Sequence, residues 1–155
     1  MDFIETHGAE LLRSYRHWTG RHLIEPCGDP RREARRLFEA PFAVVSGGAE
    51  GDQILNYGNK TAMQLWEMDW ETLTRTPSRL TAEPMHRDER AAFLRRVREH
   101  GFIEDYSGIR ISSRGRRFRI CQATVWNVTD AAGHYAGQAA TFSRWEFLGE
   151  AGANP

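Results

Sequence analysis

Five arginines gather around one predicted hairpin in the C-terminal third of the chain: Arg110, Arg114, Arg116, Arg117 and Arg119. A guanidinium group offers a planar fork of donors that matches a carboxylate or a phosphate. Strand alternation places Phe118 and Ile120 on one face and Arg117 and Arg119 on the other. Two interpretations stay open. The arginines form a solvated face paired with Glu104 and Asp105, or they form a site for an acidic ligand or partner.

No set of residues in the sequence demands catalysis. Cys121 lies in mid-strand near two arginines that could lower the pKa of its thiol, but a strand cysteine is usually buried and inert. The sequence has no Gly-x-Ser-x-Gly elbow to present a serine nucleophile. We therefore predict a non-catalytic protein, with an enzyme or a ligand carrier as an alternative.

The sequence gives equally little support for a metal site or a phosphate site. His17 and His22 are five residues apart, which is off the spacing that places two ligands on one helical face. Cys27 adds one thiolate, whereas a structural zinc site needs four ligands. The Gly-rich turn 47–52 lacks the Gly-Lys-Ser/Thr ending of a P-loop and joins two strands. We expect no metal.

Aromatic and small residues together predict a ligand pocket. Gly137, Ala139, Thr141 and Ser143 give the last strand a face of small side chains, which leaves room against a sheet. We expect a cavity between the sheet and helix 88–100, lined by Trp66, Arg79, Tyr106, Thr141 and Ser143. His86 lies at the start of that helix, where an anion can bind.

Eight residues are our candidate ligand contacts: Trp66, Arg79, His86, Tyr106, Arg119, Trp126, Thr141 and Ser143. If the ligand is acidic, we expect Arg79 or Arg119 to hold it with two parallel hydrogen bonds.

The elements that must position these residues follow from hydrophobic periodicity. We expect helices at 6–24, 31–39, 60–66 and 88–100, with Asn59 as the N-cap of the third. We expect strands at 42–46, 53–57, 102–112, 116–128 and 134–147. Successive hairpins impose antiparallel pairing, so the fold class is α+β with one five-stranded antiparallel sheet.

Composition excludes several classes of protein. The 155 residues are 40% hydrophobic and 27% charged, which argues against disorder. Lys+Arg and Asp+Glu are both 21, and zero net charge argues against general nucleic-acid binding. No apolar run is long enough for a membrane span, and the N-terminus lacks the features of a signal peptide. With two cysteines, we expect a cytoplasmic location.

The chain resembles the MEKHLA-domain family of PAS-like proteins, in its stand-alone bacterial form. The passage 54–62 looks like the strand-to-helix passage of PAS domains. The other matching stretches are 14–20, 37–42, 56–59, 77–84, 105–108 and 137–143. The resemblance runs from about residue 10 to 148, although the six-letter string that names the family is absent.

The resemblance implies a PAS-like fold with helices on one face of the sheet and an N-terminal flanking helix. It divides the chain into a helical flank (1–40), a PAS-like domain (41–148) and a flexible tail (149–155). It also implies a signal-sensing or interaction module and carries over no catalytic residue. Flavin-binding PAS domains have an Asn-Cys-Arg-Phe run where this chain reads Arg79 to Glu83, and nothing supports haem through His86. The cofactor is unknown.

We predict a module that binds an unknown small molecule, with a signalling protein as a further partner. The alternative is a ligand-free homodimerisation domain. Leu11, Tyr15, Trp18 and His22 form an apolar stripe on the N-terminal helix. The stripe either folds back on its own sheet or pairs with a second copy, and we expect the homodimer.

Overall fold

An antiparallel sheet forms the centre of the protein, and the computed structural model describes residues 2–149 of the chain. Its strands are β1 (Ala43–Gly47), β2 (Leu55–Gly58), β3 (Phe102–Ile111), β4 (Arg117–Thr129), β5 (Tyr135–Phe142) and β6 (Arg144–Phe147). Five of them lie in the order β2-β1-β5-β4-β3, and every pair is antiparallel. The predicted α+β fold with a five-stranded antiparallel sheet is confirmed.

The sixth strand, β6, is the continuation of β5. Along β4, Thr141 lies opposite Thr124 and Arg144 lies opposite Cys121, so both pieces keep one register. The interruption at Ser143 faces Gln122, whose φ of 53° is left-handed. The strand predicted at 134–147 is therefore one path with a break in its middle.

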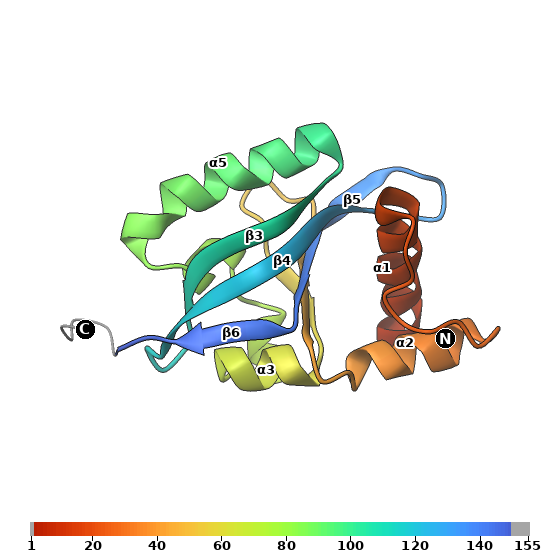
Figure 1. Cartoon of the computed structure of the whole chain (residues 1–155), viewed down its shortest axis with the longest axis horizontal. Coiled ribbons are helices and arrows are strands. Elements are labelled where there is room, and N and C mark those ends of the chain that lie inside the picture. Colours follow the sequence, from red (N-terminus) through yellow and green to blue (C-terminus); the bar gives the residue numbers. More distant parts are fainter. Residues whose placement is uncertain (1, 150–155) are drawn as a thin grey trace.

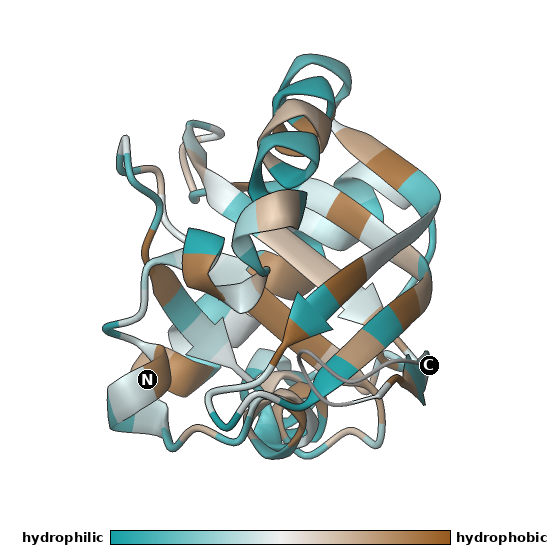
Figure 2. Ribbon diagram, turned by 90° about the vertical axis from the view of Figure 1, so that its left-hand side faces the viewer, coloured by the Kyte–Doolittle hydropathy of each residue, from teal (hydrophilic) through white to brown (hydrophobic). Residues whose placement is uncertain are grey.

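Helices cover both faces of this sheet. They are α1 (Phe3–Thr19), α2 (Pro30–Phe38), α3 (Lys60–Trp66), α4 (Trp70–Leu73), α5 (Pro84–His100) and the 3₁₀ turn η1 (Ser78–Thr81). Both α3 and α5 pack on one face, and α1 packs on the other (Figure 1). Hydrophobic and hydrophilic residues alternate along the strands (Figure 2). The ends of the helices follow local signals, such as Pro84 at the start of α5 and Gly101, with φ 95°, after it.

Asn59 joins three segments of the fold. Its Oδ1 accepts from the backbone N–H groups of Ala62 and Val44, both at 3.0 Å. Its Nδ2 donates to the carbonyls of Leu37 and Phe42 at 3.0 and 2.8 Å. The predicted N-cap of α3 is confirmed, and the same side chain also fixes the end of α2 against β1.

The apolar stripe of α1 lies on the chain's own sheet. Leu11 is 0% exposed and Tyr15 is 7% exposed, and the Tyr15 ring meets Trp126 edge-on with centroids 5.1 Å apart. Trp18 donates from Nε1 to the carbonyl of Asn127 at 2.9 Å. The expected homodimer interface is therefore wrong for Leu11 and Tyr15, because burial against Trp126 already satisfies them.

The predicted helical flank shares its core with the predicted PAS-like domain. Leu11 and Leu37 belong to the same buried cluster as Val44, Tyr57 and Trp126. In the predicted tail, residues 150–155 lie outside the described residues. No helix within residues 2–149 is both long enough and apolar enough to cross a membrane.

Candidate functional site

A narrow cavity of about 60 Å³ lies between α5 and the sheet; we call it the inner cavity. The strands contribute Val45, Leu55, Ile120, Ala123, Val125 and Ala140 to its wall. The helical side contributes Trp66, Thr81, Phe93 and Leu94. Its polar wall consists of Arg90, Tyr106 and Arg110. The inner cavity is therefore apolar on all sides but one.

The path of α5 explains why space remains beneath it. At the N-terminal end, Glu83 Oε1 accepts from Arg117 Nε at 2.7 Å, and both side chains are largely buried. Near the C-terminal end, Asn127 Nδ2 donates to the carbonyl of Arg98 at 3.1 Å. Between these contacts the 17-residue helix buries only Phe93 and Val97. A helix held at both ends with so few buried side chains leaves the sheet below it partly uncovered.

Two bulges place the polar wall. Asp105 and Gln122 have left-handed backbone, with φ of 58° and 53°, and the pairing of β3 with β4 is irregular on both sides of Tyr106. Ile103 packs toward α5 before the bulge, and Tyr106 and Arg110 line the cavity after it. Uninterrupted alternation from Ile103 would have placed Asp105 on this face instead. The bulges therefore re-aim Tyr106 and Arg110 at the cavity.

The polar wall contains two guanidinium groups without a carboxylate partner. Arg110 is 7% exposed, and it donates to Tyr106 Oη at 3.1 Å and to the carbonyl of Ile109 at 2.9 Å. Arg90 Nε is buried and has no hydrogen-bond partner. Burial, and next the charge of Arg110, lower the pKa of Arg90 to about 10. Arg90 is still charged at neutral pH, and within residues 2–149 neither Arg90 nor Arg110 forms an ion pair.

The same three residues face a second space on the outside. This outer pocket has a volume of about 190 Å³. It is lined by His86, Glu89, Arg90, Tyr106, Ser107, Gly108, Ile109, Arg110 and Arg119. A Cβ on Gly108 would lie 2.4 Å from Tyr106 Oη and 3.0 Å from an Arg110 nitrogen, so the glycine leaves room for their contact. Arg90, Tyr106 and Arg110 thus form a partition between the outer pocket and the inner cavity.

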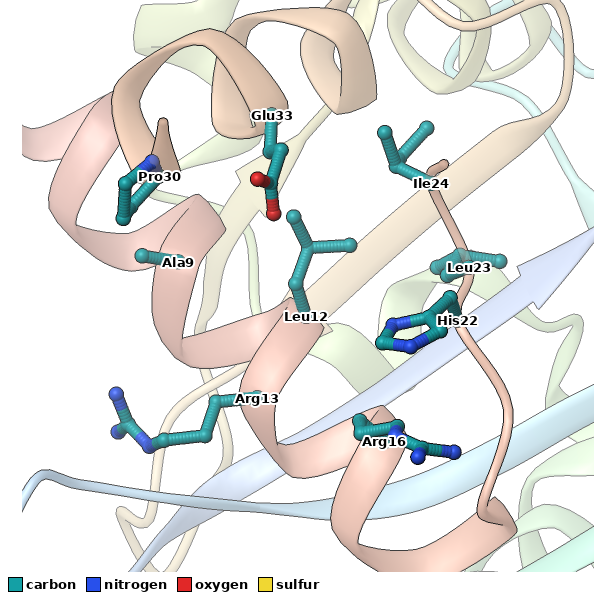
Figure 3. A pocket seen from close by; sticks show the side chains of 9 residues that line it. All are labelled: Ala9, Leu12, Arg13, Arg16, His22, Leu23, Ile24, Pro30 and Glu33. Atoms are coloured by element: carbon teal, nitrogen blue, oxygen red, sulfur yellow. The ribbon is translucent and has the colours of Figure 1, made fainter. Parts of the chain in front are cut away.

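A third space lies on the opposite side of the molecule, in the helical flank (Figure 3). This N-terminal pocket has a volume of about 320 Å³ between α1, the following loop and the start of α2. Leu12, Leu23 and Ile24 give it an apolar lining, and the side chains of Arg13 and Arg16 come from α1 (Figure 3). The sequence did not indicate this pocket.

The eight predicted contacts fall in different places. Only Trp66 and Tyr106 line the inner cavity. His86 and Arg119 line the outer pocket. Trp126 is buried under α1 on the other face of the sheet.

The remaining three predicted residues do not line the inner cavity. Arg79 is exposed, with Nε 3.3 Å from Asp52 Oδ1. Thr141 donates to the carbonyl of Ala43, and Ser143 lines an open pocket near β6. The expected lining was wrong for all three. The small-residue face of β5 points away from α5, and Ala140 lies on the face that lines the cavity.

Sequence reasoning missed Arg90, Phe93 and Arg110 as cavity residues. Helical spacing could have found Arg90, because it lies three residues before Phe93 and seven before Val97 on one face. Arg110 belonged to the arginine cluster, but only the bulge at Asp105 decides which way it points.

Solved structures similar to this chain are PAS and light-oxygen-voltage domains. The PAS domain of a protein from Colwellia psychrerythraea aligns with a TM-score of 0.63 and 13% identity, over 76% of this chain and 95% of that one. A light-oxygen-voltage domain studied with a flavin analogue aligns with 0.58 and 14%, over 76% and 85%. The light-state dimer of the fungal blue-light photoreceptor Vivid gives 0.58 and 11%, over 91% and 93%. At these identities the likeness shows a shared PAS-like fold.

The inner cavity does not fit a flavin. Its volume of about 60 Å³ is far below the roughly 300–1,000 Å³ of ligand pockets in general. No cysteine lines it: Cys27 is exposed, and Cys121 lines the pocket near β6. His86, the residue considered for haem, lines the outer pocket instead.

Sequence comparison supplies the family. A search of curated proteins found no match. The model of the MEKHLA domain matches residues 5–147, which is nearly the whole chain and includes the polar wall, α1 and the sheet. The chain belongs to the MEKHLA domain family, a PAS-like fold whose helical flank is part of the domain core.

Proposed function

We propose that the protein is a non-catalytic, PAS-like sensing module that binds a small molecule in the inner cavity. The observation that carries this proposal is the cavity itself, which is narrow, largely apolar and bounded on one side by polar groups. Sites for small molecules typically combine an apolar lining with a few polar groups that fix the orientation of the ligand. Trp66, on the helical side of the lining, has a buried indole Nε1 that has no hydrogen-bond partner among residues 2–149.

Binding could be transmitted along the secondary structure that forms the site. Phe93 of α5 stacks on Tyr106 of β3 with centroids 3.8 Å apart, so a ligand that moves Tyr106 also acts on α5. The helix α5 lies on the outside of the molecule (Figure 1) and β3 is the last strand in the order of the sheet, so a signalling partner could contact them. The proposed output is a changed surface, read by another protein.

The alternative of an enzyme has less support. A histidine and a serine do meet: His7 Nε2 lies 2.9 Å from Ser46 Oγ. The Ser46 hydroxyl, however, donates to Asn56 Oδ1 at 2.6 Å, so His7 must be the donor to Ser46. This direction is opposite to that of a Ser–His pair, in which the histidine accepts the hydroxyl proton.

The alternative of a ligand-free homodimerisation module also has less support. The residues proposed for pairing, Leu11 and Tyr15, lie under α1 against the sheet, so pairing through them would require α1 to leave its core.

Native mass spectrometry after gentle purification tests the proposed function. We expect a co-purifying small molecule on the wild type and none on Ala140→Leu, which fills the cavity. The matched control is Ala131→Leu in an exposed turn, which should keep the added mass. The same added mass on Ala140→Leu, or none on the wild type, would contradict the proposal.

A further inference from the structure

Two positive charges lie together in the polar wall, and within residues 2–149 neither of them forms an ion pair. Arg90 and Arg110 come from different elements, α5 and β3, and both line the inner cavity and the outer pocket. Within residues 2–149, Arg110 donates only to the Tyr106 hydroxyl and to the carbonyl of Ile109, and neither of these acceptors is a carboxylate. Glu89 lines the outer pocket but, within residues 2–149, makes no ion pair with either arginine.

Such an arrangement is unfavourable for the protein alone. A buried charge is normally paired, because moving a charged group out of water costs far more free energy than moving a neutral polar group. Two like charges near one another add repulsion. Surface arginines, in contrast, contact solvent or a carboxylate. Arg79, for example, pairs with Asp52. A bound anion would satisfy both groups at once.

We propose that Arg90, Arg110 and Tyr106 bind the carboxylate of a short aliphatic acid, whose hydrocarbon chain enters the inner cavity. This inference rests on the proposed function and names the class of its ligand. A carboxylate suits the site because its two oxygens match the guanidinium fork and can accept from the Tyr106 hydroxyl as well. This assignment replaces Arg79 and Arg119 as the residues that hold an acidic ligand.

The size of the inner cavity limits which hydrocarbon group the ligand can carry. A cavity of about 60 Å³ is well below the roughly 150 Å³ of a cavity known to take benzene, so a slim chain fits better than a ring. The outer pocket supplies the route, and its lining carries the positive Arg119 as well as the negative Glu89. The carboxylate then stops at the partition while the chain continues between α5 and the sheet.

Calorimetric titration with a series of straight-chain acids tests the inference on the full, ligand-free protein. From propanoate to hexanoate we expect affinity to rise about fourfold per added methylene until the chain fills the cavity. Hexanamide, which lacks the charge, should bind roughly ten- to a hundredfold more weakly than hexanoate. Benzoate should bind more weakly than hexanoate.

Variants assign the effect to the partition. Arg110→Met should weaken hexanoate at least tenfold and leave hexanamide nearly unchanged, and Arg90→Lys should weaken hexanoate because it keeps the charge without the fork. Arg95→Met, exposed on the same helix, is the matched control. Circular dichroism shows whether each variant folds. If Arg110→Met does not fold, Arg90→Lys still tests the inference.

The outcomes separate this inference from the proposed function. Equal binding of hexanoate and hexanamide, with both lost in Ala140→Leu, would overturn the carboxylate assignment and leave the cavity as the binding site. Binding that Ala140→Leu does not affect would overturn both. No binding of any acid in the series at millimolar concentration would overturn the inference alone, if native mass spectrometry still finds a co-purifying molecule.

Discussion

Replacing Arg90 by methionine should stabilise the ligand-free protein, which is the reverse of the usual effect of changing a buried residue. Burial lowers the pKa of Arg90 well below the ordinary value of an arginine, to about 10. Because the folded value lies below the unfolded one, the folded protein holds this charge at a cost at every pH below about 10. That cost is on the order of 3 kcal/mol at neutral pH.

Methionine keeps an unbranched stem in the same place and has a similar helix propensity, so little is lost in exchange. We expect Arg90→Met to raise the free energy of unfolding in urea at pH 7 by about 1–3 kcal/mol. Arg95→Met, on the exposed side of α5, should change it by less than about 0.5 kcal/mol. A loss of 1 kcal/mol or more in Arg90→Met would refute the reasoning, because it would mean that the folded chain itself stabilises the charge.

Three further predictions concern the fold. Asn59→Asp turns two donors toward carbonyl oxygens into acceptors, and it should lower the free energy of unfolding by about 3 kcal/mol or more; an unchanged urea midpoint would contradict the network. Burial lowers the pKa of His7 to about 4 from 6.5. Between these two pH values the unfolded chain takes up a proton that the folded chain does not, so His7 should remove up to roughly 3 kcal/mol of stability as pH falls. Urea titrations should show that His7→Gln loses less stability than the wild type as pH falls, and that the control His17→Gln loses as much as the wild type. Equal losses in the wild type and both variants would contradict this prediction. Trp18→Ala should cost about 2–4 kcal/mol, since Trp18 packs on Gly101, and sedimentation should show no change of oligomeric state; a shift from dimer to monomer would restore the interface predicted from the sequence.

The order of elements was predictable because its signals are local. Asn59 before an apolar run and Gly101 after one mark the ends of α3 and α5 without any knowledge of the sheet. The antiparallel pairing follows from short turns between consecutive strands. The break at Ser143 was not predictable, because it depends on the backbone of Gln122 across the sheet.

The site was harder to predict because it depends on which face each strand turns to α5. The small residues of β5 are evident in the sequence, but Thr141 lies on the face away from the cavity and Ala140 on the face toward it. The bulge at Asp105 reverses the phase of β3, and no residue type in this stretch signals it. Leu11, Tyr15 and Trp18 lie on α1 as predicted, whereas the prediction was wrong for His22, which is exposed beyond the end of the helix at Thr19. The packing of Tyr15 on Trp126 was not predictable, because the two residues are far apart in the sequence.

Methyl NMR tests the central claim most directly, that the inner cavity is the small-molecule site. The full protein, purified free of ligand, would be titrated with the extract released by denaturing the wild-type protein. We predict that shifts concentrate on the methyl groups of Val45, Val125 and Ala140, which line the cavity. Shifts confined to Leu12 and Ile24 would place the ligand in the N-terminal pocket, and this result, or no shift at any methyl group, would contradict the account.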